Sequence, residues 1–336
     1  MSPQPAYEAS FYVNPNAYFT TDPVKGTGTA SRIHLQEGAL LFIDNPYALV
    51  PTAAVNSGDY TLCSRIQCSR KIIRNANAVS CGKQCTDEVV WCNSECQQLG
   101  IAEHEFECSW LKTHAKSIRQ EIVEEDFYTL WLIVRTLAQG QLEVASTKSL
   151  MEPASTIDGS FESNWNVVRR LRSNQELFQP QKLEYWRVLV ERFLVGSHTK
   201  LHHPFDSTYM LTMTCQVETN HYDLWPKLIG IWPLPTSSSN PGESCYAYAM
   251  YLRTPFLNHS CIPNLMHQPD ESGRMVFRAA RNIAADEEFS VAYFDLAQPK
   301  YMDVKERRAY LESEFRFTCV CPRCITESGE TGSDIL

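Results

Sequence analysis

The chain has 336 residues and a formal net charge of −9, with 43% hydrophobic and 21% charged residues. That apolar content allows a sizeable core, while the negative charge disfavours strong nucleic-acid binding, which needs clustered Lys and Arg. No stretch approaches the ~20 apolar residues of a membrane-spanning helix, so no membrane association is expected. The polar, aromatic start of the chain does not read as a secretion signal. We therefore expect reduced cysteines, and grouped cysteines in a reducing compartment indicate metal ligands.

The patterning in chain order predicts strand-rich regions at both ends of a helical middle. Residues 10–50 look β-rich, because a short apolar run there is stopped by Asn-Pro. Residues 109–210 carry apolar side chains at helical spacing on either side of an expected surface loop at 146–163. Strand-like alternation returns at 245–295, and a last helix is expected at 304–315. A cysteine knuckle follows this helix, and the polar tail after Cys324 is expected to be disordered.

Eight potential zinc ligands lie in four close pairs between residues 63 and 108. They are Cys63 and Cys68, Cys81 and Cys85, Cys92 and Cys96, and His104 and Cys108. Each gap lets two side chains from one turn reach the same metal, and zinc takes four ligands, so eight ligands imply two ions. A structural zinc contributes on the order of 10 kcal/mol or more to folding, which explains how a segment poor in aliphatic residues keeps its shape. Spacing alone leaves open which pairs share an ion.

Three further cysteines lie within six residues near the end of the chain, at Cys319, Cys321 and Cys324. A closed tetrahedral site needs a fourth ligand. The cysteines left unassigned are Cys215, Cys245 and Cys261. Closed sites have no open position for water or substrate, so such zinc ions are expected to be structural rather than catalytic.

Several stretches together resemble the SET-domain family and, within it, the SET-and-MYND (SMYD) proteins. Residues 258–264 read Asn-His-Ser-Cys-Ile-Pro-Asn, which looks like the SET signature Asn-His-Ser-Cys-x-Pro-Asn. Residues 286–293, ending in Tyr293, are similar to the family's Gly-Glu-Glu motif with its terminal Tyr. Residues 25–28, Lys-Gly-Thr-Gly, resemble the N-terminal Gly-x-Gly cofactor turn. The run 63–108 resembles a MYND zinc finger, and the last helix with its cysteine knuckle resembles the subfamily's post-SET segment.

The resemblance implies an α+β fold: a β-rich SET domain of small sheets with a knot-like C-terminal segment, an inserted MYND finger and a mainly helical insert. It also implies a short form without the C-terminal helical repeat domain of better-known members. The expected boundaries are 8–55 and 241–297 for the two parts of the SET domain, 63–108 for the finger, 109–240 for the helical insert, 298–325 for the post-SET helix and zinc knuckle, and 326–336 for a disordered tail.

The resemblance further implies three structural zinc ions. It also implies that the ligand pairs of the finger interleave, as they do in MYND fingers. One ion would be held by Cys63, Cys68, Cys92 and Cys96. The second would be held by Cys81, Cys85, His104 and Cys108. The third would be held by Cys261 together with Cys319, Cys321 and Cys324.

The implied cofactor is S-adenosylmethionine, with Tyr293 in the catalytic position. A tyrosine has an ordinary pKa of about 10, so we expect its hydroxyl to orient and stabilise rather than to act as a strong base. The substrate channel is assigned to Tyr251 and Phe315. The cofactor contacts are assigned to Lys25, Gly26, Thr27, Gly28, Asn258, His259, Tyr293 and Phe317.

Three positions depart from the family pattern. The subfamily more often has Tyr at the position of Phe315, and that hydroxyl can bind the substrate amine. Its usual Asn-Ser-Phe, with the Asn near the cofactor's amino-acid end, corresponds to residues 214–220, where either Gln216 or Asn220 could serve. Asp286 replaces the usual Gly.

The resulting hypothesis is an S-adenosylmethionine-dependent protein-lysine N-methyltransferase that acts on histone tails or other lysine-containing proteins, in the nucleus, the cytoplasm or both. The negative net charge suits a basic peptide. One alternative is a catalytically weak SET and MYND scaffold, a protein-interaction or transcriptional adaptor whose finger binds proline-rich peptides. Another is a SET site that acts on a small molecule.

Overall fold

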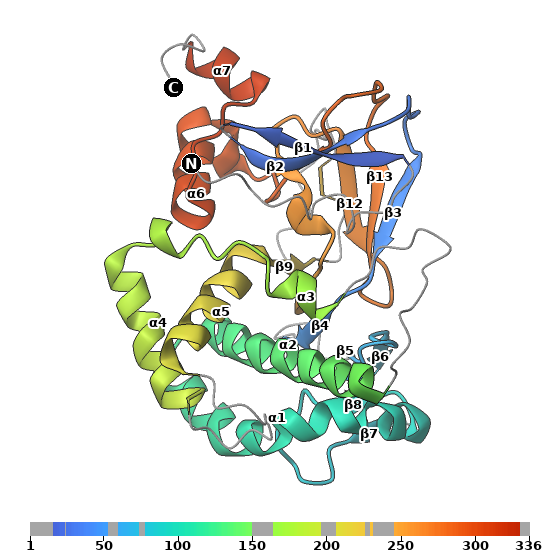
Figure 1. Ribbon diagram of the computed structural model, residues 1–336, viewed down its shortest axis with the longest axis vertical. Helices are drawn as coiled ribbons and strands as arrows, with labels where there is room; N and C mark the ends of the chain where they lie inside the picture. The colour runs from blue at the N-terminus through green and yellow to red at the C-terminus, as the bar shows by residue number, and fades with distance from the viewer. Residues whose placement is uncertain are drawn as a thin grey trace.

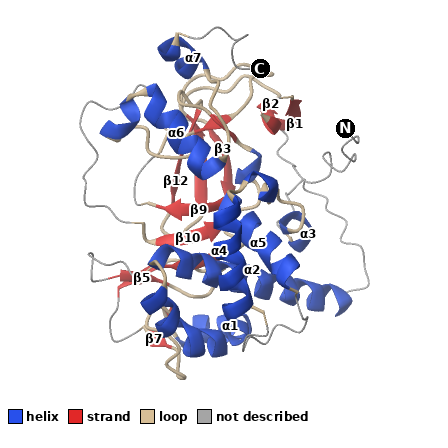
Figure 2. Cartoon of the chain, turned by 90° about the vertical axis from the view of Figure 1, so that its left-hand side faces the viewer, coloured by secondary structure: helices blue, strands red, loops and turns tan. Residues whose placement is uncertain are grey.

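The computed structural model describes residues 16–23, 25–52, 60–73, 78–149, 164–195, 206–225, 229–230 and 245–329. Figure 1 shows the larger strands β1, β2, β3, β12 and β13 in the upper part of the molecule with α6 and α7, and the long helices α1 and α2 in the lower part with the short strands β5 to β8, which makes the fold α+β as expected. Figure 2, turned by 90°, shows the same division. The described strands are β1 (Ala17–Asp22), β2 (Gly26–Ser31), β3 (Leu40–Asp44), β4 (Ala48–Pro51), β5 (Tyr60–Leu62), β6 (Lys71–Ile73), β7 (Val79–Ser80), β8 (Val90–Trp91), β9 (His221–Leu224), β10 (Ala247–Met250), β11 (Asn258–His259), β12 (Leu265–Pro269), β13 (Met275–Ala279) and β14 (Ser290–Val291).

The sheets are small, as the sequence predicts. In the described part of the chain they have two or three strands each, with the orders β1-β2, β4-β10-β9, β11-β14, β12-β13-β3, β5-β6 and β7-β8. Two of them join distant parts of the chain, since β3 pairs with β13 and β4 pairs with β10. The N-terminal strands therefore complete sheets whose other members come more than 170 residues later. The expected knot-like path of the C-terminal segment stays a prediction.

The helices are α1 (Ser94–Glu121), α2 (Glu124–Ser149), α3 (Trp165–Val168), α4 (Pro180–Phe193), α5 (Ser207–Asn220), α6 (Val304–Phe315) and α7 (Pro322–Ser328), with 3₁₀ turns η2 (Gln175–Leu177), η3 (Thr254–Phe256) and η4 (Pro299–Met302). Helix α1 begins where the side chain of Asn93 accepts a hydrogen bond from the amide of Cys96 at 2.8 Å, a typical N-cap. It then runs through the expected boundary at 108/109 without a break, so finger and helical insert share one helix.

A continuous core joins the helical and strand regions. The side chains of Trp110, Trp131 and Trp186 are fully buried in it. Within it, the buried carboxylate of Glu107 on α1 pairs with Arg135 on α2 at 2.8 Å, and Arg135 also donates to the carbonyl of Leu49 on β4. Because a buried charge must be paired, this link fixes the finger-bearing helix against the strand region.

Two expectations about local structure change. The expected surface loop at 146–163 begins later, because α2 continues to Ser149, and positions 150–163 lie outside the described residues. The tail was expected to be disordered directly after Cys324, and this was wrong for its first residues. Helix α7 continues to Ser328 and ends at Gly329 with a left-handed φ of 71°, a conformation that glycine adopts freely. The remaining positions, 330–336, lie outside the described residues.

Candidate active site and zinc centres

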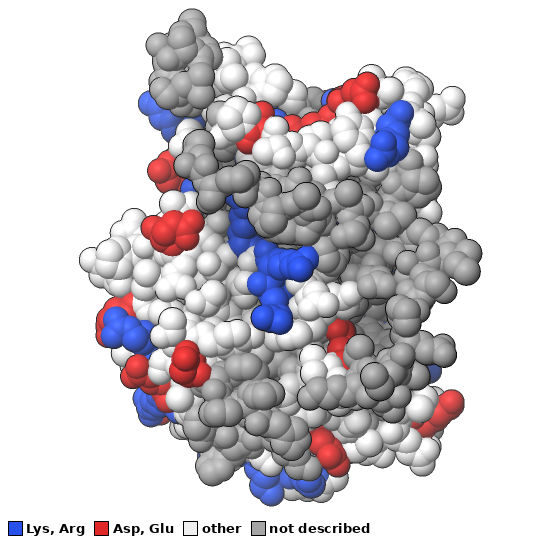
Figure 3. All heavy atoms as spheres, in the orientation of Figure 1, with Lys and Arg blue, Asp and Glu red and all other residues white. Residues whose placement is uncertain are grey.

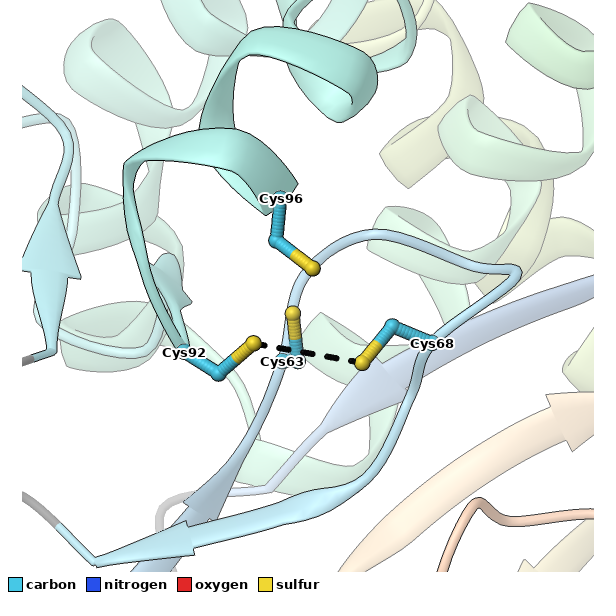
Figure 4. A group of neighbouring side chains, drawn as sticks. All are labelled: Cys63, Cys68, Cys92 and Cys96. Atoms are coloured by element: carbon cyan, nitrogen blue, oxygen red, sulfur yellow. Dashed lines mark hydrogen bonds between the residues drawn. The ribbon is translucent and has the colours of Figure 1, made fainter.

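The eight ligands of the finger form the two interleaved groups that the family resemblance predicts. In Figure 4 the sulfur atoms of Cys63, Cys68, Cys92 and Cys96 point toward one another from two loops and the start of α1. Within each group all ligand atoms lie within 4.8 Å of one another. Zn–S bonds of about 2.3 Å in a tetrahedron place sulfurs about 3.8 Å apart. The Cys68–Cys92 sulfurs are 4.0 Å apart and the Cys81–Cys108 sulfurs 3.7 Å, far longer than a disulfide.

His104 is oriented as a zinc ligand by the residues behind it. Its Nε2 lies 3.2 Å from the sulfur of Cys81 and 3.7 Å from that of Cys85. Its other ring nitrogen, Nδ1, lies 2.9 Å from the buried carboxylate of Glu107. A carboxylate on the far nitrogen fixes the ring and its tautomer, so that Nε2 is free to bind metal. The link from Glu107 to Arg135 therefore ties the second zinc site to the core.

The third group joins the C-terminal knuckle to the SET signature. Cys261, Cys319, Cys321 and Cys324 are all buried, and their sulfur atoms lie within 4.8 Å of one another. The sulfur of Cys261 is 4.0 Å from that of Cys319 and 3.6 Å from that of Cys324. Four thiols in this geometry fit a closed tetrahedral zinc site. The three groups would thus hold three structural ions and leave no ligand position for a substrate.

The signature at 258–264 and the segment 286–293, which ends in Tyr293, meet through a short parallel pairing of β11 with β14. Asn258 pairs with Ser290 and His259 with Val291, and the amide of Ser260 donates to the carbonyl of Val291 at 2.9 Å. The amide of Tyr293 donates to Nδ1 of His259 at 3.1 Å. This register places Tyr293 directly beside the Asn258–His259 turn.

The side chains of His259 and Tyr293 are both held in their neutral forms. Burial lowers the pKa of His259 to about 3, so its ring is neutral and Nδ1 can accept the bond from Tyr293. Burial raises the pKa of Tyr293 well above its usual value. Its hydroxyl donates to the carbonyl of Leu257 at 2.9 Å. The phenol therefore keeps its proton at neutral pH and presents oxygen lone pairs to its surroundings.

Two aromatic residues from the end of α6 complete the wall around this phenol. The ring centre of Phe315 lies 4.9 Å from that of Tyr293, and the ring of Phe317 lies edge-on to it at 6.2 Å. Phe317 is only two residues before Cys319. The third zinc site therefore positions the aromatic wall.

These residues surround a cavity of about 1130 Å³. Its lining includes seven of the residues that the sequence assigned to the cofactor or substrate: Lys25, Thr27, Asn258, His259, Tyr293, Phe315 and Phe317. Ligand pockets are typically about 300–1,000 Å³, so this cavity is large enough for a whole small-molecule ligand. The cavity thus brings together residues from the first strands, the signature turn and the C-terminal segment.

The two glycines of the expected cofactor turn are not part of the cavity lining, although Lys25 and Thr27 beside them are. A Cβ on Gly28 would lie 2.6 Å from Nδ2 of Asn258 and 2.9 Å from Oε1 of Glu288. A Cβ on Gly26, where φ is +80°, would lie 3.0 Å from Nη1 of Arg172. The contact at Gly28 is too close for a real Cβ, and the positive φ at Gly26 favours glycine, so both positions of Gly-x-Gly suit glycine for local reasons.

The structure places Tyr251 away from the cavity. Its side chain is fully buried in the core, and its hydroxyl donates to the carbonyl of Gly273. Tyr222 on β9 lines the cavity instead, with its ring edge-on to that of Tyr251 at 6.0 Å. The alternation of tyrosines at 246–251 predicts a strand but does not tell a core face from a cavity face.

The structure also separates Gln216 from Asn220. The amide of Gln216 is buried and donates to the carbonyl of Leu171 at 2.7 Å, whereas Asn220 lines the cavity. Asn220 and Tyr222 have the spacing of the family's Asn-Ser-Phe, and this signal could have identified both. Asn174, with a left-handed φ of 48°, and Arg172 also line the cavity, and nothing in the sequence marked them.

The residue at position 286 explains why the family favours glycine there. Asp286 has a φ of 64°, in the left-handed region, where Asp is tolerated but strained relative to Gly. Its carboxylate accepts a hydrogen bond from the hydroxyl of Tyr18 at 2.9 Å, which partly offsets that cost. The turn keeps its shape, because the amide of Asp286 donates to the carbonyl of Ser31 at 2.8 Å.

Comparison with known proteins identifies the class. The SET domain family model matches residues 60–294, and the chain belongs to this family. Over 93% of its length it is 24% identical to "Histone-lysine N-methyltransferase SET5" of Mycosarcoma maydis, covering 67% of that protein. Over 74% of its length it is 23% identical to a "SET and MYND domain-containing protein" of Dictyostelium discoideum, covering 67% of it. Over 90% of its length it is 25% identical to "Histone-lysine N-methyltransferase SMYD3" of Mus musculus, covering 60% of it.

The chain thus spans about 60 to 67% of the length of these curated relatives. Their names confirm the resemblance to SET-and-MYND proteins. A solved SET domain, titled "Crystal structure of the SET domain of LSMT bound to Lysine and AdoHcy", aligns with 93% of this chain and 55% of that one at 11% identity. Its TM-score of 0.36 is too low to support an argument about this chain. Among the described residues, no helix is long and apolar enough to cross a membrane.

Proposed function

We propose that this protein is an S-adenosylmethionine-dependent protein-lysine N-methyltransferase. The observation that carries the proposal is the meeting of Tyr293 with the Asn258–His259 turn on one wall of a large cavity. Lys25 and Thr27, which flank the glycines of the expected cofactor turn, line another edge of it. Membership of the SET-domain family and the names of the relatives support the same activity.

Methyl transfer requires that the lysine amine be neutral and lie in line with the C–S bond of the methyl donor, and this chemistry needs no metal. The amine nitrogen forms one N–C bond while one C–S bond breaks in line with it, so holding the two centres in line supplies much of the rate. When bound, S-adenosylmethionine supplies the methyl group. Asn258, His259 and Phe317 would position the donor, and Phe315 would exclude water around the acceptor nitrogen.

Tyr293 would orient the amine and stabilise developing positive charge. Its hydroxyl proton is committed to the carbonyl of Leu257, so its lone pairs are available to the methyl group and the nitrogen. Since burial raises its pKa, it is not a base at neutral pH. The amine proton would leave to solvent through the open side of the cavity before transfer.

The proposed substrates are lysine-containing proteins with basic surroundings, such as histone tails. The net charge of −9 favours approach of a basic chain. Acidic side chains at the cavity lining, among them Asp223, Asp295 and Glu314, have the sign that suits such a substrate.

The test incubates the full chain with isotopically labelled S-adenosylmethionine and a panel of histones and cell proteins. Tyr293→Phe is compared with Tyr185→Phe, whose hydroxyl binds Asp126 and which is not part of the cavity lining. We expect labelled lysine with the wild type, and roughly a 10²-fold loss of rate in Tyr293→Phe. The control should keep its rate.

A wild type that binds neither donor nor product would contradict the proposal at its first step. A wild type that binds the product S-adenosylhomocysteine but labels no lysine would favour the scaffold hypothesis instead. Mass spectrometry of the labelled protein decides whether lysine is the residue that is modified.

A further inference from the structure

Six cationic side chains line the cavity in the described part of the chain: Lys25, Arg170, Arg172, Arg281, Lys300 and Arg316. Most of them are already engaged. Lys25 pairs with Glu288, and Arg281 pairs with Glu287. Lys300 lies over the ring of Tyr301 at 4.5 Å, and Arg316 lies over that of Phe178 at 3.4 Å. Arg170 has contacts of its own.

Arg172 differs from the other five. Among the described residues, no acid, ring or hydrogen-bond acceptor is paired with its guanidinium, which lies at the exposed rim of the cavity. The group faces the turn at Gly26. A Cβ built on Gly26 would lie 3.0 Å from Nη1, 3.3 Å from Nη2 and 3.4 Å from Cζ, so the guanidinium lies across this position.

The backbone that carries Arg172 is fixed. Its carbonyl accepts a hydrogen bond from Nδ2 of Asn220 at 2.8 Å, and the next carbonyl, of Ser173, accepts one from the hydroxyl of Thr219 at 3.1 Å. Both donors come from the last turn of α5. The guanidinium of Arg172 is therefore carried by a fixed backbone and faces the turn at Gly26, and such pre-organisation suits the binding of a ligand.

The opposite charge lies at the other glycine of the turn. Oε1 of Glu288 would be 2.9 Å from a Cβ on Gly28, and it accepts a hydrogen bond from Asn258 at 2.8 Å. Gly26 and Gly28 are two residues apart on β2, a spacing of about 6.5 Å along a strand. A cation and an anion on either side of this short turn suit an α-amino acid, whose carboxylate and ammonium share one carbon and each need about 3 Å to a partner.

We propose that Arg172 binds the α-carboxylate of the methyl donor's amino-acid end, with Glu288 facing its α-ammonium. This assignment rests on the proposed function. It gives the anion to Arg172 rather than to Lys25, because the charge of Lys25 is already offset by Glu288, whereas the Glu288 carboxylate keeps lone pairs beyond its bonds to Lys25 and Asn258 with which to face the ammonium. Arg172 belongs to the helical insert, so the insert supplies part of the donor site. Figure 3 shows Lys and Arg side chains gathered near the middle of one face, where Figure 1 draws α3, β9 and the end of α5.

The experiment compares two ligands that differ by the amino-acid end. S-adenosylhomocysteine carries it, and 5′-methylthioadenosine is a similar thioether of adenosine without it. Their affinities for the full chain are measured by calorimetry for the wild type and for Arg172→Ala. We expect Arg172→Ala to weaken S-adenosylhomocysteine about tenfold, since a charge-assisted bond at an exposed rim is partly screened. Binding of 5′-methylthioadenosine should change less than about twofold.

Three further variants separate this role from a general loss of charge or structure. Arg170→Ala removes the same charge from the same cavity two residues away and should not discriminate between the ligands. Lys25→Ala tests the rival cation. Arg172→Gln keeps the side-chain length without the charge, and should repeat the selective loss even if Arg172→Ala folds poorly.

Equal weakening of both ligands by the Arg172 variants, or no weakening, would overturn the assignment while leaving donor binding intact. A selective loss in Lys25→Ala but not in Arg172→Ala would overturn it in favour of Lys25. A wild type that binds neither ligand would show that the proposed donor site itself is wrong, and the assignment would fall with it.

Discussion

Replacing Cys261 by Ala should release the C-terminal segment from the SET signature and thereby disable the cavity. Cys261 is the only ligand of the third group that lies outside the knuckle at 319–324. Its sulfur is 4.0 Å from that of Cys319, which lies 58 residues further along the chain. No other residue of the group can make this connection.

The size of the effect follows from the ligand count. A structural zinc site contributes roughly 10–16 kcal/mol, so losing one of four ligands removes about 3 kcal/mol, or about a hundredfold in zinc affinity. The loss falls on the segment that carries Phe315 and Phe317, whose rings lie 4.9 and 6.2 Å from that of Tyr293. Binding of S-adenosylhomocysteine should therefore weaken at least about tenfold.

The assay measures zinc per chain by elemental analysis and ligand affinity by calorimetry. We expect three zinc ions in the wild type and, after dialysis against a chelator strong enough to compete with the weakened site, two in Cys261→Ala. Cys215→Ala is the matched control, because Cys215 is fully buried on α5 but belongs to none of the three groups. Three zinc ions and an unchanged affinity in Cys261→Ala would refute both the ligand assignment and the role of the zinc in positioning the wall.

Three other changes test separate parts of the structure. Gly28→Ala should weaken S-adenosylhomocysteine at least about tenfold, because its Cβ would lie 2.6 Å from Nδ2 of Asn258, while Gly82→Ala, with no atom within 4 Å, should not; equal affinities would contradict this packing. Burial raises the pKa of Asp44 to about 6, so the folded state holds that proton more tightly than the unfolded chain does. Stability should therefore fall by at most about 3 kcal/mol as pH rises from 4 to above 6, and Asp44→Asn should remove that slope in urea unfolding; parallel slopes would exclude it. Zinc chelation should speed hydrogen exchange across residues 79–108 more than across β12 and β13, whereas uniform exchange would argue against a finger held by metal.

The chemistry of the metal sites could be predicted from the sequence because zinc ligands come in local pairs. The pairing of Cys92 with Cys96, for example, is set by one turn of backbone and needs no knowledge of the fold. The interleaving of the pairs came from family resemblance, and the structure confirms it. The same holds for Cys261, which spacing could not distinguish from Cys215 or Cys245.

Predictions of which face a residue occupies were less secure. The assignment of Tyr251 to the substrate channel rested on the alternation of tyrosines along a predicted strand. Such a pattern assigns side chains to the two faces of the strand but does not indicate what packs against either face. Here the core covers Tyr251, and the cavity receives Tyr222 from the neighbouring strand. The choice between Gln216 and Asn220 was open for the same reason, since both lie on one helix and only packing decides which end reaches the cavity.

The sequence by itself determined the local chemistry of this protein: which thiols pair, where glycine is required, and which motif carries the phenol. Tertiary structure alone decided what faces those groups across the cavity. Arg172 meets Gly26, and Phe315 meets Tyr293, because helices and strands far apart in the chain pack against one core. Backbone geometry fixes neighbours within a turn or a strand, whereas contacts between distant segments depend on how the side chains of all those segments fill the interior together.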